Sequence, residues 1–338
     1  MIWQFDIIVL LFMAICAFFA IQVKDLLGAA IVLGVYSFLM CLLWTEMGAV
    51  DVAFTEAAVG AGVSTVLFIA AVHRSSRRVK TKRSGRMLSK AAGLASAGLL
   101  GAALFYASGG FPNWADPASP AASHLSPYFI TQTLSDTSVP NIVTAVLADY
   151  RGYDTLFETA VIFTAGMAVL MILGRRHDEN NIQAGNIIEA GYEDSIIQTV
   201  SRTLIPFIQI FALYVVGHGH HSPGGGFQGG VLLGATFVLM AISFNLKMVL
   251  GRISEKKNLL LANTGVIVYA GIGALCIALG ANFLDYSILR KLLPATDQVM
   301  ARSHAILGVE IGVAMTVTAI IILIYSNLAS GGTNKKGL

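Results

Sequence analysis

The sequence predicts an all-α, polytopic integral membrane protein with about nine transmembrane helices, and three observations lead to that prediction. Mean hydropathy is +0.73, and hydrophobic residues make up 56% of the 338 residues. Charged residues make up only 12%, roughly half of the share found in soluble domains. Most apolar residues lie in blocks of roughly 18 to 24, the length that one helix needs to cross a bilayer.

The spans follow from these blocks in chain order. We expect helices at residues 3–23, 27–45, 50–72, 88–108, 156–174, 203–219, 227–246, 259–282 and 304–327. The first block begins almost at Met1 and lacks the basic segment and the small-residue cleavage site of a signal peptide. We therefore expect it to remain in the protein as a helix.

The basic residues predict the orientation in the membrane, because cytoplasmic loops carry an excess of Lys and Arg. Seven of them crowd the connection after the third span: Arg74, Arg77, Arg78, Lys80, Lys82, Arg83 and Arg86. If that loop is cytoplasmic, alternation places the N-terminus outside and the C-terminus in the cytoplasm. The same bias accounts for the net charge of +3, so we expect no nucleic-acid partner.

Two polar connections, the basic loop and residues 175–202, divide the chain into three predicted modules. The modules are residues 1–75 with three transmembrane helices, residues 76–180 with two, and residues 195–330 with four. The second module also contains an external segment, in which Gly109 to Pro127 is expected to be irregular.

Glu56 lies inside the third span, where an acidic residue costs about 2.5–3.5 kcal/mol on insertion scales. Such a group usually faces a partner, a cavity or an ion path, so Glu56 indicates that this chain moves something charged. Gly60 and Gly62 follow it closely and permit a local π-type bulge. Candidate sodium ligands beside Glu56 are the side-chain oxygens of Thr55, Ser64 and Thr65.

A short helix along the interface is predicted from Pro140 to Tyr150, where apolar residues recur at helical spacing. Its apolar face consists of Ile142, Val143, Val146 and Leu147. Four charged residues then lie at the mouth of the fifth span: Asp149, Arg151, Asp154 and Glu158. Two interpretations stay open, a salt bridge from Arg151 to Asp154 or Asp149 that caps the helix, or an ion path.

A second intramembrane acid, Glu310, lies in the ninth span between Gly308 and Gly312. The glycines are typical of close helix packing, whereas an intramembrane acid is functional by default. An ion path and a structural partner both stay open for Glu310. Glu46 and Asp51 lie at the outer turn between the second and third spans and are candidates only for an ion entrance.

The string GHGHHSPGGGFQGG at 217–230 joins the sixth and seventh spans. Three glycines after a proline do not favour a helix, but they permit positive φ and a backbone turn that is buried in protein. The three histidines of this string are candidates for proton handling at an entrance, because imidazole titrates near neutral pH: His218, His220 and His221. An alternative is that these histidines only hold the turn by hydrogen bonds.

Neither a metal nor a cofactor is expected. The three histidines lack the i, i+4 spacing of a helical zinc pair. The cysteines occur singly inside apolar runs, without the spacing of a disulfide framework, an iron–sulfur site or a haem attachment: Cys16, Cys41 and Cys276.

Three strings in this order resemble the Mrp-type multisubunit sodium/proton antiporter: DVAFTEAAVGAG at 51–62, PNIVTAVLADYRGYDTL at 140–156 and GHHSPGGGFQGG at 219–230. The chain is similar to the C-terminal region of the antiporter's A-type polypeptide fused to its B-type polypeptide. It is also similar to small membrane subunits of membrane-bound hydrogenase and related respiratory complexes. The resemblance implies ion-translocation roles for Glu56, Asp149, Arg151, Asp154, Glu158 and His220, with Glu56 the most deeply buried acid of these strings.

The resemblance implies a non-enzymatic subunit of a cation/proton antiporter complex in the plasma (cell inner) membrane. Its expected partners are Na⁺, H⁺, the lipid bilayer and other membrane subunits, including a large antiporter-like subunit whose lysine-bearing broken helices are absent from this sequence. Three alternatives stay open. They are an ion-translocating subunit of an energy-converting hydrogenase-like complex, a structural scaffold without its own ion path, and a metalloenzyme that uses the histidine loop.

Overall fold

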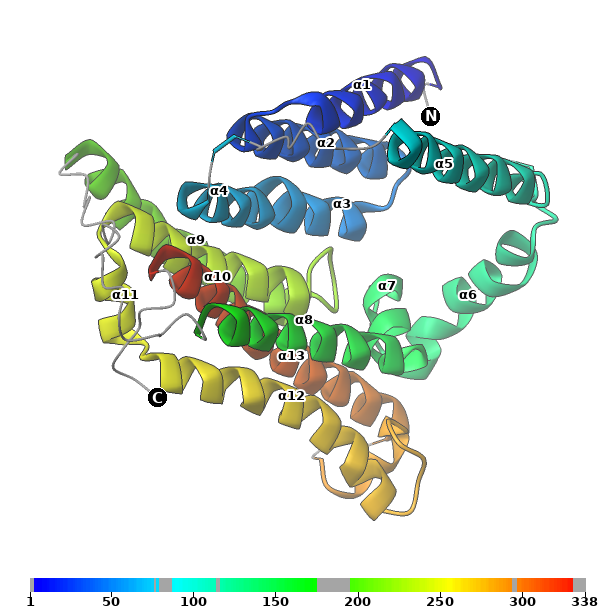
Figure 1. Ribbon diagram of the computed structural model, residues 1–338. Helices are drawn as coiled ribbons and strands as arrows, with labels where there is room; N and C mark the ends of the chain where they lie inside the picture. Colours follow the sequence, from blue (N-terminus) through cyan, green and yellow to red (C-terminus); the bar gives the residue numbers. More distant parts are fainter. Residues whose placement is uncertain are drawn as a thin grey trace.

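The computed structural model describes residues 3–75, 77–78, 87–113, 116–174, 195–293 and 297–330. Within these residues, nine helices are long and apolar enough to cross a membrane, and no β-strand is present, which confirms the predicted fold class (Figure 1). The spans are Phe5–Gln22, Leu26–Glu46, Val50–His73, Ala91–Ser108, Gly152–Leu173, Ser195–His218, Gly226–Ser243, Glu255–Ala278 and Gln298–Ser330. The orientation of the two termini stays a prediction.

The predicted and observed spans agree within a few residues, except that the sixth begins at Ser195 and the ninth at Gln298. The α-helices are α1 Trp3–Gln22, α2 Leu26–Glu46, α3 Val50–Glu56, α4 Thr65–Arg74, α5 Met87–Ser108, α6 Ser126–Thr137, α7 Ile142–Ala145, α8 Gly152–Gly174, α9 Ser195–His218, α10 Gly226–Ser243, α11 Leu246–Arg252, α12 Glu255–Ala278 and α13 Gln298–Ser330. Three segments are π-helical, Ala57–Ser64, Ala121–Leu125 and Val146–Tyr150, and Tyr286–Lys291 is a 3₁₀-helix.

The third span is interrupted by the π-helix Ala57–Ser64, which joins α3 to α4 and confirms the predicted bulge. In its wide turn the Thr65 hydroxyl donates a hydrogen bond to the Gly60 carbonyl at 3.2 Å. A methyl group at Gly60 would meet the Glu56 carboxylate and, at 2.8 Å, the Ser37 hydroxyl of α2. Glycine therefore lets α2 and the Glu56 side chain lie directly against the bulge.

The core of the protein surrounds α13, which lies between α8, α10 and α12 (Figure 1). Residues on several sides of α13 are almost fully buried: Ile306, Val309, Val317, Ile320 and Leu323. A helix that is apolar all round is typical of a buried position. The first three spans form a separate group, in which α1 packs on α2 and α2 packs on α3, the π-helix and α4. This group joins the rest where α4 meets α13 and the π-helix meets α10.

Gly265 allows α12 and α13 to approach each other closely. A methyl group there would meet the Thr316 side chain and the Gly312 carbonyl of α13, and would lie 2.8 Å from the Thr316 nitrogen. We expect Gly265→Ala to destabilise the protein by about 1–3 kcal/mol, the usual effect of overpacking. The matched control is Gly271→Ala on the same helix, where the added methyl group meets no atom within 4 Å.

Thermal unfolding of the detergent-purified protein compares the two variants. Gly271→Ala is expected to leave the melting temperature unchanged or to raise it, because alanine favours a helix over glycine by about 0.5–1 kcal/mol. Equal melting temperatures for the two variants would show that α12 and α13 do not depend on this close approach.

The connection between the fourth and fifth spans is more helical than predicted. Gly109 to Pro127 is not irregular throughout, because Ala121–Leu125 is π-helical and α6 begins at Ser126; α6 itself was not predicted. The predicted helix before the fifth span is confirmed as α7 and the π-helix Val146–Tyr150. Its buried side consists of Thr144, Ala145 and Ala148, whereas Val143 and Leu147 of the predicted apolar face are 40% and 42% exposed.

Several predictions fall outside the described residues. These include the positions of Lys80, Lys82, Arg83 and Arg86 in the basic loop, and most of the polar connection at 175–194. The three-module division at residues 1–75, 76–180 and 195–330 stays a prediction. Side chains of α5 are exposed from Ala91 to Ser108, and no other described helix packs closely against them.

Candidate functional site

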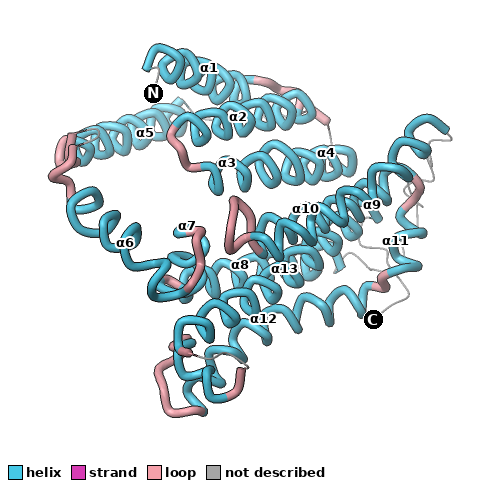
Figure 2. Tube along the Cα trace, turned by 180° about the vertical axis from the view of Figure 1, so that it is seen from behind, coloured by secondary structure: helices cyan, strands magenta, loops and turns pink. Residues whose placement is uncertain are grey.

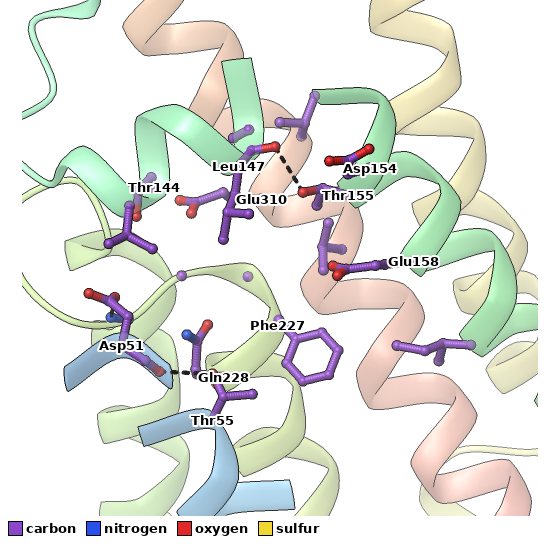
Figure 3. A pocket seen from close by; sticks show the side chains of 18 of the residues that line it. Asp51, Thr55, Thr144, Leu147, Asp154, Thr155, Glu158, Phe227, Gln228 and Glu310 are labelled. Atoms are coloured by element: carbon purple, nitrogen blue, oxygen red, sulfur yellow. Dashed lines mark hydrogen bonds between the residues drawn. The ribbon is translucent and has the colours of Figure 1, made fainter. Parts of the chain in front are cut away.

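A cavity of about 730 Å³ lies where elements from the three predicted modules meet. One wall is the start of α3, a second is formed by α7, the π-helix after it and α8, and the third is formed by the glycine loop, α10 and α13. Figure 3 shows polar side chains from these walls directed toward a common space. Most of the other lining residues are apolar, among them Val52, Val143, Phe157, Val161 and Val309.

Four carboxylates line the cavity, and all four are predicted site or entrance residues: Asp51, Asp154, Glu158 and Glu310. Asp154 forms an exposed ion pair with Arg151 at 2.5 Å, which agrees with one of the two interpretations of these charges. The Glu158 carboxylate lies one turn further along α8 and has no hydrogen bond or ion pair with any other described residue. Glu310, on α13, is only 7% exposed. The cavity thus presents carboxyl groups from three separate helices.

The glycine loop between α9 and α10 is held by hydrogen bonds from the segments around α3 and α7 (Figure 2). Asn141 donates hydrogen bonds from Nδ2 to the carbonyls of Gly219 and Ser222 at 3.0 Å, and its backbone nitrogen donates to the His220 carbonyl at 2.8 Å. Asp51 Oδ1 accepts from the Gly224 amide at 3.2 Å and from Asn141 Nδ2 at 3.4 Å. The loop is therefore a turn whose backbone is bonded to protein, as predicted.

Glycines are required in this loop because it lies against Glu310. Gly224 and Gly225 have φ of +159° and +131°, which side chains other than glycine rarely adopt. A methyl group at Gly225 would lie 2.7 Å from Glu310 Oε1, and one at Gly226 would overlap the Glu310 backbone. The glycine string thus positions the start of α10 directly over an intramembrane acid.

The same loop brings His220 to Glu310. His220 Nε2 and Glu310 Oε2 are 4.0 Å apart, and neither atom has a hydrogen-bond partner among the described residues although both are buried. Burial lowers the pKa of His220, and the nearby His221 and His304 lower it further. Burial thus favours the neutral form of the imidazole.

The other histidines and Glu46 lie elsewhere. His218 stacks on Tyr214 with ring centroids 4.7 Å apart, and the exposed His221 packs against His218 at 5.4 Å. Glu46 is exposed at the end of α2 and does not line the cavity. The structure therefore brings His220 to the site and leaves these three entrance candidates outside it.

Asp149 pairs with Arg302 of α13, at 2.6 Å between Oδ2 and Nε, and does not pair with Arg151. Of the two partners that the sequence left open for Arg151, the structure has Asp154 and not Asp149, because Asp149 points into the protein whereas Arg151 is exposed. Burial raises the pKa of Asp149, and the Arg302 guanidinium opposes that rise. Arg302 also lies over the Tyr150 ring at 5.4 Å, and burial with a hydrogen bond to Asp136 raises the Tyr150 pKa to about 12.

Glu56 is not the most deeply buried acid of the quoted strings, because it is half-buried whereas the Asp149 side chain is only 8% exposed. Its carboxylate lies over Gly60, close to Ser37, and does not line the cavity. Thr55, the residue before it, does line the cavity. The helical turn explains the difference, since neighbouring residues point about 100° apart.

Among the residues of the site that were not predicted are Asn141, Gln228 and Arg302. Asn141 follows a proline and caps α7, a local signal that could have identified it. Arg302 lies on the predicted external side, where the charge rule disfavours Lys and Arg. Its position therefore indicated that it needs an acidic partner. Within the described residues, no group of three His, Cys, Asp or Glu side chains is arranged to hold a metal ion.

Three family models match the chain in succession. Residues 11–77 match MbhD and residues 111–186 match MbhE, both of them subunits of MBH. Residues 196–323 match a domain related to the MnhB subunit of Na⁺/H⁺ antiporters. Putative antiporter subunits mnhB2 of Staphylococcus aureus strains Newman and JH1 are each 27% identical over 138 residues. That alignment covers 41% of this chain and 96% of each relative.

Two solved structures are also similar. The Mrp complex from Dietzia sp. DQ12-45-1b matches with a TM-score of 0.74 and 26% identity, over 95% of this chain. The match covers 34% of the Dietzia chain, so this chain spans about a third of its length. A chain of an archaeal membrane-bound sulfane sulfur reductase matches with a TM-score of 0.49 and 24% identity, over 70% of this chain and 99% of that one.

Proposed function

We propose that this multi-pass membrane protein is a subunit of a multisubunit cation/proton antiporter. The reason is that the chain joins an MbhD-type, an MbhE-type and an MnhB-type region. The MnhB-type region is homologous to putative antiporter subunits, and the fold matches about a third of a chain from an Mrp complex. We expect other membrane subunits to supply the parts of the machinery that this chain lacks. Helix α5, which no other described helix covers, is where we expect one of them to bind.

The observation that carries this proposal is the cavity with its four carboxylates. Acidic groups within membrane spans are costly and usually face a partner, a cavity or an ion path. Here they converge from separate parts of the chain on one space that can hold water and a cation. Carboxylate, amide and hydroxyl oxygens are the ligands that hard cations prefer, and Gln228, Thr55 and Thr155 add such oxygens to the lining.

Three of the cavity carboxylates, and Glu56 outside the cavity, have roles in the proposed path. Asp154 and Glu158 attract a cation to the mouth of the cavity, and Arg151 holds Asp154 in place. Glu310 is the inner acid of the cavity, buried under the glycine loop. Glu56, with Gly60 and Ser37 beside it, is the next carboxylate in the first region, and the π-helix lets that turn rearrange.

The test is Glu158→Gln in the assembled complex, reconstituted into vesicles. Glu158 opens into the cavity and has no described ion-pair partner, so its removal leaves no orphaned charge. We expect cation-dependent proton flux to fall about tenfold or more, equivalent to about 1.4 kcal/mol of lost stabilisation of the cation. The matched control is Glu46→Gln, which removes an exposed acid outside the cavity and is expected to leave the flux unchanged.

Normal flux in Glu158→Gln would contradict the cavity as the ion path. Glu56→Gln then separates the remaining possibilities. Loss of flux only in Glu56→Gln would place the path along α2 and the π-helix, whereas normal flux in both variants would favour a structural scaffold.

A second candidate function is an ion-translocating subunit of an energy-converting respiratory complex. The match of the first two regions to MbhD and MbhE favours it. Identification of the co-purifying subunits distinguishes the two, because a redox module adds subunits with cofactor absorption and an antiporter assembly does not.

A further inference from the structure

His220 and Glu310 each bury a polar atom that has no hydrogen-bond partner among the described residues. A buried donor or acceptor without a partner costs about 1–3 kcal/mol. The two atoms face each other at 4.0 Å, about 1 Å beyond a hydrogen bond. That gap is too short for a water molecule in line between them, so a small approach of the two side chains is the direct way to satisfy both atoms.

We propose that His220 and Glu310 form a proton-sharing couple, which takes one proton from the cavity into a hydrogen bond between His220 Nε2 and Glu310 Oε2. This role rests on the proposed function of the cavity. A hydronium ion in the cavity gives up the proton and becomes water, and release returns the proton to cavity water. No other bond forms or breaks. A single proton thus satisfies both orphaned atoms and neutralises the carboxylate.

The geometry favours this couple over two independent groups. The side chains of His220 and Glu310 are only 12% and 9% exposed, so bulk water does not compete for either atom. Without a proton between them, that is with the imidazole proton on Nδ1, His220 Nε2 and a carboxylate oxygen are both acceptors and cannot bond to each other. With the proton, one of them becomes a donor and the pair closes.

Other titratable groups face the couple from several elements. Asp51 of α3 opposes negative charge on Glu310, and His221 of the loop and His304 of α13 oppose positive charge on His220. Glu158 of α8 shares the cavity, and the Tyr269 hydroxyl of α12 interacts electrostatically with Glu310. These neighbours disfavour a doubly charged pair and favour a state that holds one proton.

The couple is also connected to the second and first regions through the loop. The His220 carbonyl accepts from the Asn141 backbone nitrogen, and Asp51 holds the Gly224 amide. Closing the pair moves the loop relative to these anchors. Proton uptake is thereby coupled to the position of the cavity walls.

Infrared difference spectra of the purified complex, recorded as the pH is changed, test the couple. The spectra of Glu310→Gln identify the carboxyl band of Glu310 by its loss. In His220→Gln and His220→Asn we expect the pH midpoint of that band to move by about one unit or more, because a close ionisable neighbour shifts a pKa by about 1–3 units. The matched control is His218→Gln, a histidine at the end of α9 whose ring contacts are Tyr214 and His221, in which the midpoint is expected to stay in place.

An unchanged midpoint in both His220 variants, or no titrating band that Glu310→Gln removes, would overturn the couple. The result is independent of the transport test. Normal flux in Glu158→Gln together with a His220-dependent Glu310 band would reject the cavity as the ion path and retain the proton-sharing pair.

Discussion

Gly226→Ala is expected to cause the largest loss of stability among single substitutions in the glycine loop. The added methyl group would overlap the Glu310 carbonyl and lie 2.7 Å and 2.9 Å from the Glu310 carbonyl carbon and Cα. These are backbone atoms of the central helix α13, so no side-chain rotation relieves the overlap. We expect at least the upper end of the roughly 1–3 kcal/mol that overpacking usually costs.

The experiment compares thermal unfolding and complex assembly for Gly226→Ala and Gly217→Ala. Gly217 lies at the end of α9, just before the loop, where an added methyl group meets no atom within 4 Å. Gly217→Ala should therefore assemble normally with an unchanged or slightly raised melting temperature. If both variants behaved alike, close packing of the loop on Glu310 would not be the reason for the glycine string.

Asp149→Asn is expected to be the second large effect, because it leaves Arg302 without its partner on a side chain that is only 22% exposed. Breaking a buried ion pair from one side costs about 3–5 kcal/mol, and the partial exposure of Arg302 places the expected loss near the lower end, about 3 kcal/mol. Asp154→Asn is the matched control, since Asp154 and Arg151 form an exposed pair close by in the chain, at 47% and 62% exposure. That variant should lose less than about 1 kcal/mol.

The double variant Asp149→Asn with Arg302→Gln completes the cycle. Removing both charges should recover part of the stability lost in Asp149→Asn, because no unpaired guanidinium then stays half-buried. The measurement is the midpoint of thermal or denaturant unfolding of the purified protein. Equal losses for Asp149→Asn and Asp154→Asn, or no recovery in the double variant, would show that the Asp149–Arg302 pair is not a significant source of stability.

The spans and the bulge were predictable because they depend on local sequence. A bilayer requires each spanning segment to satisfy its own backbone hydrogen bonds, so an apolar block of sufficient length indicates one helix. Gly60 and Gly62 after Glu56 likewise indicated a weak point in the third span, and the π-helix Ala57–Ser64 lies there. Helix α6 was missed because its polar, weakly amphipathic sequence between Ser126 and Thr137 lacks such a block.

The individual site residues were visible in the sequence as costly charges, but their partners were not. Asp149 and Arg302 are 153 residues apart, and Asp51 and Asn141 are 90 apart. No periodicity relates such positions, so the sequence offered only a partner close in the chain, Arg151, for Asp154 or Asp149. The folding of α13 between α8 and α10 decides instead that Arg302 reaches Asp149.

By itself, then, the sequence determined the all-α membrane class, the nine spans and the residue types at the candidate site, because the bilayer imposes those constraints on each segment separately. Only the tertiary structure decided that Asp51, Asp154, Glu158 and Glu310 share one cavity, that Glu56 lies outside it, and that the glycine loop lays His220 against Glu310. Those arrangements depend on how helices from three regions pack around α13, and packing is a property of the assembled surfaces.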